Sequence, residues 1–349
     1  MITLSILTRR LSLAATMIFM LLLVNCSESD DEDVVIGDEN TAELTFGIRH
    51  DLSLDDYEEI ASNISPYDTD EYPDFSPIIC FNYSDDGSDD KDSYATGTLV
   101  SEYWVLTAGH NFFSSDEQSS PTLVSGIDVL VGLDPNNPDA EHEVEKIVFH
   151  PTWLEDDDLF TTANDLALVK LKTPITNITP ALINDEEVES IGIIIWYAGF
   201  GDYSNQPGQD PDLISKMHAI QNTLDRTSTG ILSQSSAGTY LGGLLAFDFD
   251  SPNGNVNTLG DDRTTEEENL LGGSTTSSAI ALPFEASTVP GDSGGPLMMK
   301  LDGMWKVCGV LSGAAESALP DHEGSNYGEI DVFIRTATAY DWISAVITE

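Results

Sequence analysis

The chain has 349 residues, which is enough for one large domain or two. It carries 61 acidic residues against 13 lysines and arginines. The resulting net charge of −48 repels nucleic acid and anionic membranes, whose phosphates are bound by lysine and arginine. We attribute this charge to a high-salt or marine habitat in preference to a cationic ligand. Acidic side chains are also Ca²⁺ ligands, but the sequence lacks EF-hand spacing, and a structural calcium ion stays unassigned.

Residues 1–25 have the organisation of a secretory signal peptide. Arg9 and Arg10 precede an apolar run that ends at Val24 and is shorter than the roughly 20 residues of a membrane span. The sequence LVNC, which ends at Cys26, resembles a bacterial lipobox, although its asparagine is larger than the residue usual there. We expect an exported protein, anchored by lipid at Cys26 to the outer membrane or cell surface. A free secreted product and an uncleaved signal anchor are the alternatives.

Two segments precede the main body of the chain. Residues 26–45 are acidic and poor in large apolar residues, and we expect an acidic disordered tether there. Residues 46–77 form an N-terminal extension, in which apolar residues at helical spacing predict a helix over 52–63 with Ser53 as its N-cap.

From residue 78 the sequence consists of short β-type runs separated by Gly, Pro, Asn and Asp, a pattern that indicates a sandwich or a barrel. Residues 249–278 are rich in Gly, Ser, Thr, Asn and acids and predict an exposed, mobile insertion. The pattern over 340–347 predicts a final helix. Cys80 and Cys308 either pair or remain two buried thiols.

Three short blocks carry the candidate chemistry. They are LTAGH, which ends at His110, NDLAL, which contains Asp165, and PGDSGGP, which contains Ser293. Each block alone is weak evidence for catalysis, because a serine between glycines usually lies in a turn and a single histidine is more often structural than catalytic. In the chain order His, Asp, Ser they match one of the known arrangements of a catalytic triad.

With these blocks, residues 78–349 resemble a trypsin-like (chymotrypsin-fold) serine protease of the bacterial secreted type. Further matching stretches are GTLVSEYWVLTAGH, WYAGFGD, GVLSG and DVFIRTATAYDWI. The resemblance implies an all-β fold of two six-stranded antiparallel β-barrels with a C-terminal helix. It also implies a serine endopeptidase that acts on proteins or peptides through an acyl-enzyme, with no cofactor.

The resemblance assigns a role to each candidate residue. His110 would be the general base, Asp165 would orient it, and Ser293 would be the nucleophile. The amides of Gly291 and Ser293 would form the oxyanion hole, and Ser312 would support Asp165.

Three further positions correspond to the substrate pocket, namely Ser287, Gly313 and Asp331. Ser287 by itself implies an apolar preference. Asp331 stands where the family usually has glycine, and a carboxylate pointing into the pocket would favour Arg or Lys instead. The alternative is that Asp331 faces solvent.

The sequence departs from the family in two ways. Ala95 and Asn111 occupy the positions of the disulfide that usually flanks the catalytic histidine, so packing must hold that loop. The chain also lacks an Arg/Lys-Ile-Val-Gly-Gly activation site, and we expect Asp292 to find a cationic partner other than a newly cut N-terminus. We treat the five other histidines as structural or surface residues.

Two other functions remain as alternatives. The chain could be a catalytically silent surface-binding protein on a protease scaffold, although the complete set of triad residues favours an enzyme. It could also be an esterase that uses the same triad, although the Gly-x-Ser-x-Gly elbow of α/β-hydrolases is absent in its usual chain order.

Overall fold

The computed structural model describes residues 46–63, 72–84, 91, 93–112, 125–156, 158–203, 215–260, 265–272, 277–320 and 322–348. These residues fall within one compact unit, Glu43–Glu349. The predicted signal peptide, the tether and Cys26 lie outside the described residues. A search of the described helices finds none with the length and apolarity needed to cross a membrane.

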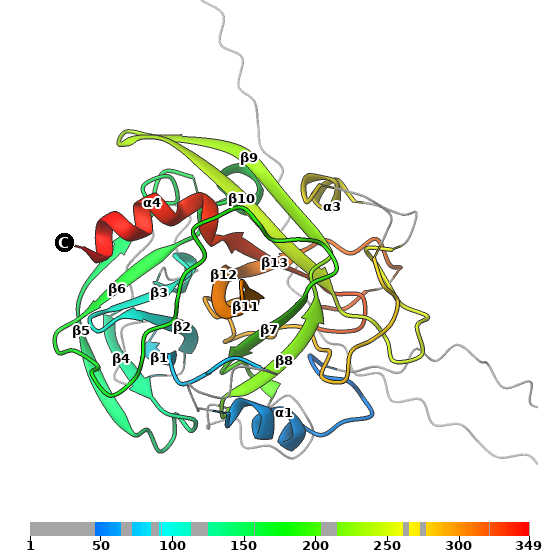
Figure 1. Ribbon diagram of the computed structural model, residues 1–349, viewed down its shortest axis with the longest axis horizontal. Coiled ribbons are helices and arrows are strands. Elements are labelled where there is room, and N and C mark those ends of the chain that lie inside the picture. Colours follow the sequence, from blue (N-terminus) through cyan, green and yellow to red (C-terminus); the bar gives the residue numbers. More distant parts are fainter. Residues whose placement is uncertain are drawn as a thin grey trace, which may run out of the picture. The chain divides into compact units, whose positions relative to one another are not determined.

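The first half of this unit is a closed antiparallel barrel with the strand order β1-β2-β3-β6-β5-β4 (Figure 1). Its strands are β1 (Ile78–Ser84), β2 (Ser93–Ser101), β3 (Trp104–Thr107), β4 (Ser125–Val131), β5 (Ala140–Phe149) and β6 (Ala167–Leu171). The interior is filled by β-branched, aliphatic and aromatic side chains, among them Phe81, Val105 and Val169. These residue types suit a pleated surface that is buried on one side.

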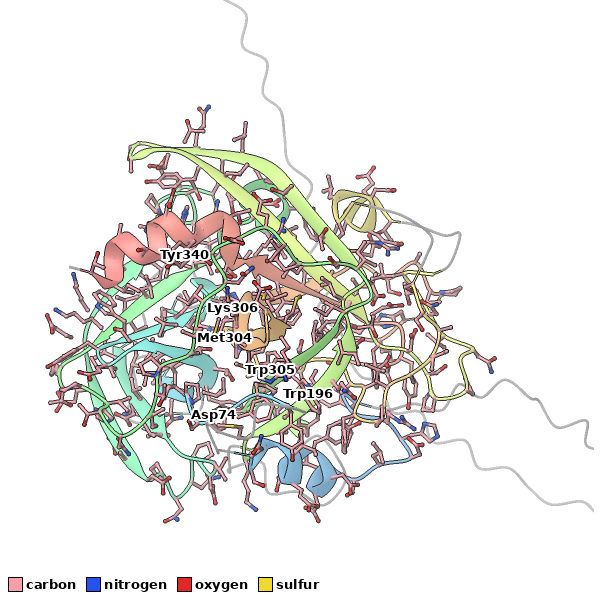
Figure 2. All side chains as sticks on the ribbon, viewed as in Figure 1. Asp74, Trp196, Met304, Trp305, Lys306 and Tyr340 are labelled. Atoms are coloured by element: carbon pink, nitrogen blue, oxygen red, sulfur yellow. The ribbon has the colours of Figure 1, made fainter. Side chains whose placement is uncertain are left out.

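The second half is a seven-stranded antiparallel sheet with the order β8-β7-β11-β12-β13-β10-β9. Its strands are β7 (Ile194–Gly199), β8 (His218–Thr223), β9 (Arg226–Ser235), β10 (Gly238–Asp248), β11 (Pro296–Leu301), β12 (Met304–Ala315) and β13 (Ile330–Arg335). β11 pairs with β7 on one edge and with β12 on the other. Trp196 on β7 and Trp305 on β12 are labelled in Figure 2.

The all-β, chymotrypsin-like fold is thus confirmed, but the second half differs from the predicted six-stranded barrel by one strand. Its two edge strands, β8 and β9, are consecutive and separated only by Leu224 and Asp225. The N–H of Leu224 donates to the carbonyl of Ile193 beside β7 at 2.9 Å, whereas the N–H of Asp225 donates to Ala246 of β10 at 3.0 Å. A single bent segment of the chain therefore provides β8 at one edge of the sheet and β9 at the other edge, which brings the number of strands to seven.

The helices are α1 (Leu54–Ala61), α2 (Leu159–Thr162), α3 (Glu266–Leu270) and α4 (Thr336–Ile347). The helix predicted over 52–63 is confirmed as α1. The backbone N–H and the hydroxyl of Ser53 donate to the Asp56 carboxylate at 2.8 and 2.7 Å, an arrangement that stabilises the start of this helix. The predicted final helix is confirmed as α4, which begins earlier than expected.

The prediction of an exposed insertion over 249–278 is wrong for its first part. Phe249 and Leu259 are fully buried. The N–H of Phe249 donates to the carbonyl of Glu329 at 3.0 Å, and its carbonyl accepts from the N–H of Gly328 at 2.8 Å. The polar composition of the segment concealed these two apolar anchors, which fix residues 249–260 to the body of the protein.

The two cysteines of the described chain are unpaired, which decides between the alternatives left open by the sequence. Cys80 on β1 and Cys308 on β12 are both buried free thiols. Burial raises the pKa of each thiol well above its ordinary value, so both remain protonated and unreactive at neutral pH.

Several carboxyl groups are buried where β8 and β9 meet the end of β10. Burial, together with the charge of neighbouring carboxylates, raises the pKa of Asp225 to about 9 and that of Asp250 to about 10. Burial likewise raises the pKa of Glu285 to about 8. These groups therefore carry protons at neutral pH in the folded protein.

The buried acids predict that the protein becomes less stable as the pH rises. The pKa of Asp250 is ordinarily 3.8 and is about 10 in the fold. Between these values the folded chain keeps a proton that the unfolded chain releases, so the free energy of unfolding falls as the pH rises. Asp250→Asn removes this contribution, and we expect a smaller decrease in Tm between pH 5 and pH 9 than in the wild type. The exposed control Asp341→Asn should keep the wild-type decrease, and an equal decrease in Asp250→Asn would contradict the assignment.

Candidate active site

His110 and Asp165 are brought together by the pairing of two neighbouring strands. His110 begins a short 3₁₀ helix just after β3, and Asp165 lies just before β6. Because β3 and β6 are antiparallel, with Thr107 opposite Ala167, the end of one strand meets the start of the other. His110 Nδ1 lies 2.6 Å from Asp165 Oδ2, and the backbone N–H of His110 donates to Oδ1 at 2.9 Å. The imidazole is thereby held with its Nε2 side directed away from the carboxylate.

Ser312 supports the same carboxylate from the second half of the protein. Asp165 is completely buried, and Ser312 Oγ donates to its Oδ2 at 2.6 Å. The ladder between β12 and β13 pairs Leu311 with Phe333 and then Gly313 with Val332, so Ser312 is left out of register. Such a bulge redirects a side chain, here towards Asp165.

The environment of His110 favours its protonated form. Burial lowers the pKa of the imidazole, but the negative charge of Asp165 and the hydrogen bond to it raise the pKa, and the net shift is upward. The side chain is still 34% exposed, so solvent can reach the imidazole. An imidazole held in this way is suited to accept a proton and to stabilise the resulting charge.

Ser293 is placed beside His110 by contacts of its backbone. Its carbonyl accepts hydrogen bonds from Thr96 N on β2 at 2.9 Å and from Asn111 Nδ2 at 3.0 Å. Asn111 directly follows His110, so the loop that carries Ser293 meets the loop that carries His110 at this point. Within the described residues no hydrogen bond joins Ser293 Oγ to His110, a contact that often tightens only when substrate binds.

Two backbone amides next to Ser293 are oriented by the carbonyls on the same peptide planes. The carbonyl of Pro290 accepts from the N–H of Asp202 at 2.7 Å, and that of Asp292 accepts from the Tyr197 hydroxyl at 2.6 Å. A trans peptide directs its N–H opposite to its carbonyl, so the N–H groups of Gly291 and Ser293 point away from those partners. Neither N–H donates to another described residue, and the pair can receive an anionic oxygen.

The loop around His110 is held without the disulfide usual at this place. Asn111, at one of the two matching positions, donates from Nδ2 to Thr107 Oγ1 at 3.1 Å as well as to Ser293. Phe112 is fully buried, and its ring lies 5.4 Å from that of Phe81 in an edge-to-face contact. A side-chain amide and an aromatic contact thus anchor the loop, while Ala95 is buried in β2.

The three predicted pocket residues lie on three segments of the second half, with Gly313 on β12, Asp331 on the neighbouring β13 and Ser287 in the segment before β11. Asp331 on β13 is 1% exposed and accepts a hydrogen bond from the Thr288 hydroxyl, so the alternative that it faces solvent is wrong. Ser287 is fully buried beside it. Burial, with the charge of Glu329 in addition, raises the pKa of Asp331 well above its ordinary value. A side chain added at Gly313 would meet open space, as is typical of a cleft wall.

One contact of the loop that carries Ser293 is not evident from the sequence. Asp292 is fully buried, and its Oδ1 lies 3.2 Å from Nε2 of His218, which is also fully buried. The sequence around His218 contains no motif, and the sequence alone indicates only a structural or surface histidine. Across the part of the chain that the structure describes, no cluster of three or more His, Cys, Asp or Glu residues could hold a metal ion.

A hollow in the protein lies apart from these residues. It is lined by parts of β4 and β5 and by Met217, and none of its lining residues is a predicted site residue. The candidate active site is therefore the junction of the two halves rather than this hollow.

Known proteins were compared with this chain. The family model described as "Trypsin" matches residues 79–236 and 251–343. The chain belongs to the trypsin family. The match spans both halves of the structure and includes His110, Asp165 and Ser293.

Individual known proteins are similar in sequence to parts of this chain. The complement C1s-1 subcomponent of Mus musculus is 40% identical over 84 residues, which are 23% of this chain and 12% of that protein. The transmembrane protease serine 11C of the same species is 26% identical over 259 residues, 71% of this chain and 46% of that protein. The chain thus spans less than half the length of these curated relatives. A Glu endopeptidase solved in complex with MPD has a TM-score of 0.50 at 14% identity, covering 78% of this chain and 91% of that one, and shows the same fold.

Proposed function

We propose that this trypsin-family protein is a serine endopeptidase with His110, Asp165 and Ser293 as its catalytic triad. The observation that supports this most strongly is the buried Asp165 carboxylate, which joins His110 and Ser312 at 2.6 Å each. The Ser293 loop is tied to the residue that follows His110, and two adjacent amides are available for an oxyanion. Peptide substrates follow from the protease fold.

The proposed reaction follows from these positions. Ser293 Oγ attacks the carbonyl carbon of the scissile peptide while His110 Nε2 takes the hydroxyl proton. The carbonyl oxygen becomes an oxyanion that accepts hydrogen bonds from the N–H groups of Gly291 and Ser293. When the C–N bond breaks, His110 returns the proton to the leaving amine. Water then hydrolyses the acyl-enzyme with His110 again as base, and no cofactor enters either step.

We further propose that the enzyme is exported and held at the membrane by lipid at Cys26. The basic residues and apolar run before this cysteine, and the acidic run after it, support export and anchoring. A mature protein that retains 61 acidic residues also suits an aqueous, saline exterior.

Asp331 supports a preference for substrates with Arg or Lys before the scissile bond. Its carboxylate is buried against Thr288, five residues before the nucleophile, and does not face solvent. As a neutral acid it is a hydrogen-bonding group. A guanidinium or ammonium group entering the pocket would favour its ionised form, because opposite charges a few ångströms apart attract strongly when water is excluded.

Covalent labelling tests the nucleophile and separates an enzyme from a silent scaffold. We expect a fluorophosphonate probe to modify the protein at Ser293, and Ser293→Ala to lose both labelling and peptide hydrolysis. Ser190→Ala, at an exposed serine, is the matched control and should label like the wild type. A folded wild-type protein that neither labels nor cleaves peptides would favour the surface-binding alternative, and turnover of esters but not peptides would favour the esterase.

Substrate profiling tests the role of Asp331. With peptide substrates that differ only in Arg, Lys, Phe or Leu before the cleaved bond, we expect the highest kcat/KM for Arg and Lys. Asp331→Asn keeps the size of the side chain but cannot ionise, and should reduce kcat/KM for the basic substrates by at least about tenfold, or roughly 1.4 kcal/mol. A wild-type preference for Phe or Leu would show that Asp331 does not determine which residue is preferred before the cleaved bond.

A further inference from the structure

The carboxylate of Asp292, the residue between the two that carry the proposed oxyanion-hole amides, is enclosed by the protein. Its Oδ1 accepts a hydrogen bond from the N–H of Gly201 at 2.8 Å, and its Oδ2 accepts from the N–H of Val289 at 3.0 Å. Side chains at Gly199 or Gly201 would collide with the carboxylate, so the absence of a Cβ at both positions lets the backbone approach it. Asp292 itself has no exposed surface.

His218 is the one basic side chain that the described structure places within ion-pairing distance of this carboxylate. It begins β8 opposite Gly199, and its Nε2 lies 3.2 Å from Asp292 Oδ1. The ring is fully buried, and the ring of Tyr203 packs against it edge to face at 4.3 Å. Neither ring nitrogen makes an aligned hydrogen bond to another described residue, so Asp292 is its principal polar neighbour.

A buried carboxylate is unstable without a partner of opposite charge, because water no longer solvates it. Asp292 lies between Gly291 and Ser293 in the chain, and its carbonyl fixes the peptide that carries the Ser293 N–H. A change in the orientation of the Asp292 side chain would therefore turn both amides of the oxyanion hole. The partner of Asp292 thus bears on catalysis without touching the substrate.

The N-terminal extension closes the same region from the other side. The carbonyl of Gly47 accepts from Ser287 N at 2.7 Å, and its N–H donates to the carbonyl of Ser325 at 2.6 Å. Gly47 has a φ of +76° and packs so closely on Tyr203 and Val289 that any side chain there would collide with them. The Tyr57 hydroxyl of α1 donates to the carbonyl of Glu285 at 2.9 Å. Residues 46–61 are therefore built into the segment that leads to Asp292.

We propose that His218 is a positioning residue: it supplies the internal positive charge that holds Asp292, and with it the amides of Gly291 and Ser293, while residues 46–61 remain attached. The inference rests on the proposed endopeptidase function. It identifies the cationic partner that we expected for Asp292 and requires no cleavage of the chain within residues 46–79.

Kinetics of three variants at His218 test whether its charge is needed. His218→Gln removes the charge at similar size and should lower kcat at least about tenfold while KM changes less than about threefold, because the oxyanion is bound more strongly in the transition state than in the ground state. His218→Lys and His218→Arg restore a cation, and at least one of them should recover most of the lost kcat. His142→Gln, on the surface of the first barrel, is the matched control. A His218→Gln variant with wild-type kcat, or Lys and Arg variants no better than Gln, would overturn the proposal.

Two further measurements do not depend on turnover. In a double-mutant cycle of His218→Gln and Asp292→Asn, we expect the decrease in Tm of the double variant to be smaller than the sum of the two single decreases, and additive decreases would overturn the pairing. Peptide mapping of the fluorophosphonate-labelled protein should recover peptides that run without a break from residues 46–61 through residue 79. A new N-terminus within 46–79 would contradict the inference. If the wild type neither labels nor cleaves, the proposed function fails, while the cycle still decides whether His218 and Asp292 are coupled.

Discussion

The carbonyl of Ser293 is one point at which the two halves of the protein are joined by hydrogen bonds, and the candidate site depends on this contact. The carbonyl belongs to the second half, and both of its hydrogen-bond donors, Thr96 N and Asn111 Nδ2, belong to the first barrel. The Thr96 hydroxyl also donates to the carbonyl of Gly291 at 3.0 Å. Because the main chain of Thr96 and the side chains of Thr96 and Asn111 hold the backbone on both sides of Asp292, the loop that carries Ser293 is fixed against the loop that follows His110.

Two buried carboxylates organise this junction, and each has a histidine as its basic neighbour. Asp165 contacts His110, and Asp292 contacts His218. In a chain with only 13 lysines and arginines, long basic side chains are scarce, and the imidazoles are short enough to be enclosed. The two pairs differ in surroundings, since Asp165 also accepts from Ser312 and Asp292 from two backbone amides. In the proposed mechanism, the first pair meets the reacting atoms and the second supports the backbone that receives the oxyanion.

The sequence predicted those features that are encoded locally. LTAGH and GDSGGP each correspond to a turn beside a strand, so His110 and Ser293 could be singled out from their motifs. The helix that begins after Ser53 followed from the spacing of its apolar residues. The features it did not predict arise from pairing between distant segments. No local pattern marks His218 as a neighbour of Asp292, and the direction of the Asp331 side chain depends on the register of β13 with its neighbours. The burial of Phe249 was hidden by a polar surrounding sequence, and the bend at Leu224 and Asp225, which separates β8 from β9, has no mark in the local sequence.

The most direct test of this account is a crystal structure of the protein with a peptidyl phosphonate bound. We predict a covalent bond from Ser293 Oγ to phosphorus. One phosphonyl oxygen should lie within about 3.1 Å of the backbone nitrogens of both Gly291 and Ser293. His110 Nε2 should lie within hydrogen-bond distance of Ser293 Oγ, with its Nδ1 still bound to Asp165. A phosphonyl oxygen directed away from both amides, or an adduct on another residue, would contradict the central claim.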